Sequence, residues 1–107
     1  MIKNQLVTVF NDNIPVSIRN RILKIIVFGS YARGDSAPDS DLDVAVIVDR
    51  KDAFVEKLLE DAAYQAMLDT DFKTIISVKV FSDESFNACL QKGFAFYRHI
   101  ADEGVVV

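Results

Sequence analysis

The chain has 107 residues, half of them apolar, which predicts one small domain over residues 1–107 with a single hydrophobic core. A formal net charge of −4 argues against a broad basic surface that grips nucleic acid, and it fits a small-nucleotide substrate or a basic protein partner better. We see no signal peptide and no apolar run long enough to span a membrane, and the single cysteine excludes an internal disulfide, so we expect a cytoplasmic protein.

The N-terminal region is expected to be helical. Apolar residues recur near helical spacing over residues 2–11, and Pro15 favours a second helical turn that runs through Arg21, because proline is tolerated at the first helical position. A basic cluster follows, made of Arg19, Arg21 and Lys24. We interpret this cluster as a solvated face in preference to a phosphate contact.

A short apolar, β-branched run over residues 23–28 predicts a buried strand. It ends at Gly29, where the missing Cβ lets the backbone approach a ligand closely. Ser30 adds a hydroxyl at the start of a predicted short helix that ends at Arg33, and free N–H groups at a helix start attract phosphate. We therefore expect Gly29 and Ser30 to bind phosphate.

Arg33 lies beside this expected phosphate site. It could bind a phosphate through two parallel hydrogen bonds, or it could pair with Asp35 or Asp39 in the loop that follows. The sequence leaves both alternatives open.

A second buried strand is predicted over residues 42–48, and two aspartates stand at its start. Asp41 and Asp43 are two residues apart, so on a strand both side chains point to the same face. Neighbouring carboxylates repel each other unless a cation lies between them, and carboxylate oxygens suit Mg²⁺. The spacing thus predicts a divalent-metal pair beside a phosphate cradle, the two parts that nucleotidyl transfer needs.

The rest of the chain alternates helices and one more strand. Asp52 is expected to cap a long helix over residues 53–68, and Ser82 to cap a shorter one. The remaining expected elements are a strand over residues 74–81, helices over residues 83–91 and 94–102, and a terminal segment, residues 105–107, that forms an edge strand or packs on a partner. Three strands between helices predict a small α/β or α+β domain with a mixed sheet.

The spacing Gly29-Ser30, ten residues, Asp41-Leu42-Asp43 resembles the signature of the DNA polymerase β nucleotidyltransferase superfamily. The extended stretch from Phe28 to Asp43, the chain length and the ending over residues 96–106 resemble its minimal nucleotidyltransferases. The resemblance implies a mixed sheet of three or four strands flanked by helices. It also implies a Mg²⁺-dependent enzyme, with one or two ions, that moves a nucleoside monophosphate, AMP from ATP, to an acceptor hydroxyl.

In that resemblance Asp41 and Asp43 are the catalytic metal ligands, and Gly29 and Ser30 hold the β- and γ-phosphates. Minimal nucleotidyltransferases of this kind are commonly encoded beside a HEPN-domain protein, so the resemblance implies an antitoxin whose acceptor is a tyrosine on a HEPN toxin. A second hypothesis is a catalytically weak or inactive binding module that neutralises its partner through an exposed face around Phe94, Phe96 and Tyr97. An antibiotic- or tRNA-modifying transferase ranks last, and a homo-oligomer stays open.

One position departs from the superfamily pattern. Active members usually carry a third carboxylate on the strand after the long helix, and here that place falls on or near Lys79, with Ser77 on the same face. Lys79 could neutralise a phosphate, or it could pair with an aspartate and exclude a metal. Two further residues, His99 and Cys89, are interpreted as structural rather than catalytic.

Overall fold

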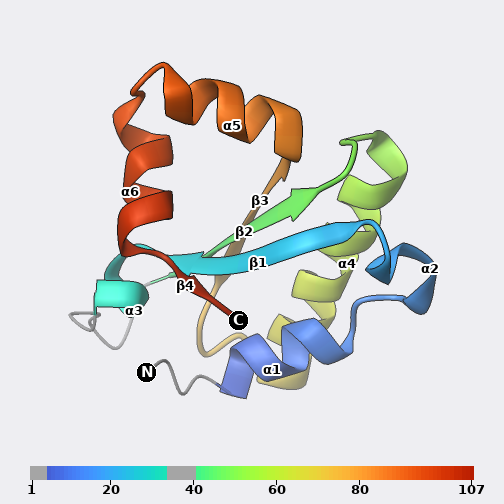
Figure 1. Cartoon of the computed structure of the whole chain (residues 1–107). Helices are drawn as coiled ribbons and strands as arrows, with labels where there is room; N and C mark the ends of the chain where they lie inside the picture. The colour runs from blue at the N-terminus through green and yellow to red at the C-terminus, as the bar shows by residue number, and fades with distance from the viewer. Residues whose placement is uncertain (1–4, 34–40) are drawn as a thin grey trace.

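The structure is a computed structural model that describes residues 5–33 and 41–107, apart from the side chains of Ser30 and Arg33. A four-stranded mixed sheet runs through the molecule (Figure 1). Its strands are β1 (Ile22–Phe28), β2 (Leu42–Val48), β3 (Ile76–Ser82) and β4 (Val105–Val106). The described helices are α1 (Gln5–Asp12), α2 (Val16–Arg19), α3 (Ser30–Arg33), α4 (Ala53–Asp69), α5 (Asp83–Gln91) and α6 (Ala95–Glu103).

The strand order is β3-β2-β1-β4, so β1 and β2 form the centre of the sheet. β1 pairs antiparallel with both β2 and β4, whereas β2 and β3 are parallel and are connected through α4. This arrangement confirms the expected mixed sheet of three or four strands. The terminal valines form the edge strand β4, one of the two alternatives for that segment.

Helices cover both faces of the sheet, α1 and α4 on one side and α5 and α6 on the other (Figure 1). Both faces of β2 are therefore buried, which explains its continuous apolar sequence. Val44, Val46 and Val48 point toward α1 and α4, whereas Ala45 and Ile47 point toward α5 and α6.

Local signals place most element boundaries close to the expected residues. The Asp52 side chain accepts a hydrogen bond from the Val55 N–H at 2.9 Å, and the Ser82 hydroxyl accepts one from Ser85 at 3.1 Å, so both expected helix caps are confirmed. The third strand begins at Ile76, two residues later than expected. In the part of the chain that the structure describes, no helix is both long and apolar enough to cross a membrane.

Candidate nucleotide site

The antiparallel pairing of β1 and β2 brings the glycine bend next to the second aspartate. Phe28 lies opposite Asp43 in the register, and the chain leaves β1 at Gly29 with a φ of +75°. A Cβ built on Gly29 would overlap Oδ2 of Asp43. Only glycine therefore allows the Asp43 carboxylate to lie directly against the backbone at this bend.

The Asp43 carboxylate lies in an unfavourable electrostatic environment. It is partly buried, and its pKa is raised first by this burial and then by the negative charge of Asp41, while Lys79 acts in the opposite direction. Among the described residues, neither aspartate forms an ion pair. The oxygens of both carboxylates are therefore available as ligands, and the two negative charges repel each other. This arrangement fits Mg²⁺, because a bound cation would relieve that repulsion.

The parallel register of β2 and β3 shows which residues of β3 lie beside the aspartate strand. Ser77 lies directly beside Asp43, and Lys79 lies two pairs farther along, beside Ala45. Lys79 is exposed and forms no ion pair with described residues, so it influences Asp43 only through its charge. Within residues 5–33 and 41–107, no group of three metal-ligating side chains comes together.

Comparison with known proteins shows the family of the chain. Residues 6–103 match the model of the nucleotidyltransferase domain family. The chain belongs to this family. The nucleotidyltransferase is 33% identical over 98 residues to a Methanocaldococcus jannaschii protein named "Putative protein adenylyltransferase MJ0604", an alignment that covers 92% of this chain and 90% of that protein. A second relative from the same organism, "Putative protein adenylyltransferase MJ0141", is 34% identical over 53 residues, which is 50% of this chain and 54% of that protein.

Solved structures share the fold. A crystal structure named as a putative nucleotidyltransferase from Sulfolobus solfataricus matches with a TM-score of 0.59 at 16% identity, over 95% of this chain and 76% of that chain. A toxin–antitoxin crystal structure with AMP-PNP matches with a TM-score of 0.54 at 22% identity, over 99% of this chain and 72% of that chain. These likenesses confirm the polymerase β-like nucleotidyltransferase fold that the sequence indicates.

A groove of about 420 Å³ opens beside the glycine bend of the nucleotidyltransferase. It lies between the end of β1 and one side of α6, and its lining residues are Phe28, Gly29, Phe96, His99 and Glu103. His99 is exposed, and its Nδ1 lies 3.5 Å from Oε2 of Glu103 one helical turn away. Sequence reasoning did not place His99 near the bend, because this proximity depends on how α6 packs against β1.

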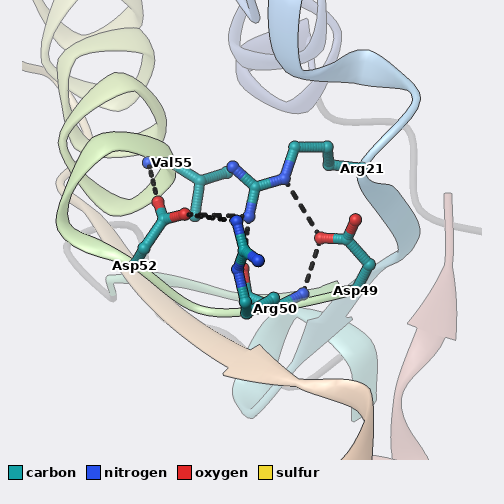
Figure 2. A network of polar contacts seen from close by, with 5 residues as sticks. All are labelled: Arg21, Asp49, Arg50, Asp52 and Val55. Atoms are coloured by element: carbon teal, nitrogen blue, oxygen red, sulfur yellow. Dashed lines mark hydrogen bonds and ion pairs between the residues drawn. The ribbon is translucent and has the colours of Figure 1, made fainter.

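The opposite end of the β1–β2 pair carries a structural ion network (Figure 2). Arg21 contacts Asp49 through Nε and Asp52 through Nη2, both at 3.1 Å, and its Nη2 donates to the Arg50 carbonyl at 2.6 Å. The Arg21 side chain is only 19% exposed, so the interpretation of this arginine as part of a solvated face is wrong. Arg19 and Lys24 are exposed, as expected of a solvated face.

Some expected site residues lie outside what the structure describes. The side chains of Ser30 and Arg33 and the whole of residues 34–40 belong to this group, so the alternatives for Arg33 stay predictions. Asp41 is described and is exposed immediately before β2.

Cys89 is half-buried on α5. Its hydrogen bond with Tyr97 is the largest cause that raises the pKa of that tyrosine.

Proposed function

We propose that this nucleotidyltransferase transfers AMP from ATP to a hydroxyl group of a protein, with release of pyrophosphate. The observation that carries the proposal is the contact between the Gly29 bend and Asp43, with Asp41 two residues away on the same segment. The 33% identical relative named as a protein adenylyltransferase supports a protein acceptor.

In this proposal the backbone around Gly29 and Ser30 holds the terminal phosphates, and Asp41 and Asp43 hold one or two Mg²⁺ ions. When bound, Mg²⁺ neutralises negative charge on the phosphate oxygens. The acceptor oxygen forms a bond to the α-phosphorus, the bond from that phosphorus to the α,β-bridging oxygen breaks, and pyrophosphate leaves. Ser77 carries no carboxylate to accept the hydroxyl proton, so this proton passes to water.

We further propose that the acceptor is a tyrosine on a HEPN-domain toxin and that the chain acts as its antitoxin. The sequence resemblance to minimal nucleotidyltransferases supports this partner. The toxin–antitoxin structure with AMP-PNP shares the fold of the chain and is consistent with the proposal. Phe94, at the start of α6, offers an aromatic side chain for contact with such a protein, since it is 51% exposed.

A second candidate function is a binding module that neutralises its partner without catalysis. The observation that favours it is the position of Ser77 beside Asp43, because this serine supplies no third carboxylate. Within residues 5–33 and 41–107 the site has two carboxylates, both needed to hold metal, and neither is left to activate the acceptor.

The decisive experiment is a label-transfer assay with Mg²⁺ and the HEPN-domain partner that the proposal predicts. Label at the α-phosphate of ATP should move to the partner, whereas label at the γ-phosphate should not. Transfer should be lost in Asp41→Asn and Asp43→Asn and retained in Asp61→Asn, a matched change of an exposed carboxylate on α4. Full neutralisation of the toxin by the double variant, with no transfer by the wild type, would instead favour the binding module.

A further inference from the structure

We propose that the groove beside Gly29 binds the nucleobase of the nucleoside triphosphate, with Phe96 as its stacking surface and the His99–Glu103 pair as its hydrogen-bonding edge. This inference rests on the proposed function, since it assigns the nucleoside end of the same substrate. The glycine and aspartate signature itself gives no indication of this binding site.

The position of the groove supports this assignment. Gly29 belongs both to the groove and to the bend against which the Asp43 carboxylate lies. A nucleotide whose phosphates lie at this bend therefore has the groove within reach of its nucleoside. α6 runs beside the end of β1 from which α3 begins, so the groove and the proposed phosphate site lie at the same end of the sheet (Figure 1).

The size and the aromatic side chains of the groove suit a planar ring. Its volume of about 420 Å³ lies within the range of small-molecule sites. Phe96 is 42% exposed, and its ring packs edge-on against Phe28, at 5.8 Å and 87°, and against Tyr97, at 5.5 Å and 87°. A partly exposed aromatic ring that its neighbours hold in place offers a surface on which a nucleobase can stack.

The polar side of the groove offers complementary hydrogen-bonding groups. Glu103 is an acceptor, and the imidazole of His99, 3.5 Å away from it, can donate. Every nucleobase places a donor next to an acceptor on its pairing edge, so this pair can bind the edge of a stacked base. The exposed fraction of the His99 side chain, 68%, leaves its second ring nitrogen accessible.

The test compares two probes by calorimetry on the full chain in Mg²⁺: ATP, and inorganic tripolyphosphate, which has no base. Wild-type protein should bind ATP more tightly than tripolyphosphate. Phe96→Ala should weaken ATP binding on the order of tenfold and leave tripolyphosphate binding unchanged. Phe94→Ala is the matched control, because Phe94 is a similarly exposed aromatic residue that does not line the groove, and it should change neither affinity.

A second variant keeps the shape of the groove in case Phe96→Ala fails to fold. Glu103→Gln replaces an acceptor by an amide, so the order of affinities among ATP, GTP, CTP and UTP should change while tripolyphosphate binding stays constant. An unchanged order, or equal affinities of Phe96→Ala and wild type for ATP, would overturn the inference.

Two other outcomes separate this inference from the proposed function. If tripolyphosphate shows no Mg²⁺-dependent binding to the wild type, the phosphate and metal site itself is refuted. If the groove variants bind all nucleotides normally but no longer label the protein partner, the groove holds the acceptor, and the assignment to the nucleobase is wrong.

Discussion

The two ends of the β1–β2 pair both gather aspartates, and they use them in opposite ways. At one end Arg21 lies 3.1 Å from both Asp49 and Asp52, and the pKa of Asp52 is lowered, first by the hydrogen bond from the Val55 N–H and then by Arg21. At the other end the pKa of Asp43 is raised, and among the described residues it has no ion-pair partner. Carboxylates whose negative charge has no partner in the folded chain are typical of functional sites. Carboxylates that are paired with a cation or a hydrogen-bond donor stabilise the fold.

The largest expected effect comes from Asp43→Asn. Asp43 would hold the Mg²⁺ that neutralises negative charge on the phosphate oxygens, and weaker metal binding raises the barrier by several kcal/mol, so transfer should fall on the order of 10²-fold or more. The same change should raise Tm, because the amide removes both a partly buried charge and its repulsion with Asp41. The transfer rate and the Tm, measured on the same preparation, check these two expectations. A lower Tm in the variant would contradict the view that Asp43, unlike Asp52, destabilises the fold.

A pair of glycine variants isolates the role of the bend. Gly29 and Gly93 have nearly equal φ values, +75° and +78°, so alanine at either position should cost about 1–2 kcal/mol of backbone strain. Only at Gly29 would the new Cβ meet the Asp43 carboxylate; at Gly93 nothing lies within 4 Å. We expect Gly29→Ala to abolish Mg²⁺-dependent ATP binding and Gly93→Ala to preserve it, measured by calorimetry. Equal ATP binding by both variants would show that the Gly29 bend is not part of the nucleotide site.

Removal of the Arg21 ion pairs, at the opposite end of the β1–β2 pair, should lower stability and leave the transfer reaction unchanged. Arg21→Gln removes both ion pairs and leaves Asp49 and Asp52 close together, so the urea midpoint should fall while transfer by the folded protein stays near wild type. Arg19→Gln, at an exposed arginine two residues earlier, should change the midpoint less. Loss of transfer in folded Arg21→Gln would mean that the two ends are not separate.

The smallest expected effect is a pH dependence of stability. Because the pKa of Asp52 is lower in the folded chain than in the unfolded chain, its contribution is complete above the ordinary aspartate value and is lost as the pH falls through the lowered value. Asp52→Asn keeps a side-chain oxygen for the helix cap but removes the charge. Urea unfolding between about pH 6 and about pH 2.5 should therefore show a shallower acid loss in the variant than in the wild type. Identical slopes would contradict this role.

The sequence predicted what local spacing determines. The caps at Asp52 and Ser82 and the limits of α3 follow from neighbouring residues. Gly29 was identifiable as a bend where the backbone can approach a ligand closely, but its contact with the Asp43 carboxylate depends on the pairing of β1 with β2.

What the sequence missed depends on contacts between distant segments. Arg21 meets Asp49 only because Ile22 pairs with Val48 across the sheet, a register that composition does not specify. The parallel register of β2 and β3 places Ser77, more directly than Lys79, beside Asp43. The groove likewise arises only when α6 packs on β1, so its lining could not be read from the spacing of the α6 residues.

The most direct test of the central claim is a crystal structure of the chain with Mg²⁺ and a non-hydrolysable ATP analogue. We expect the phosphates against Gly29 and Ser30, with Mg²⁺ about 2.0–2.1 Å from oxygens of Asp41 and Asp43. A nucleotide bound elsewhere, or a metal held without these two carboxylates, would contradict the account.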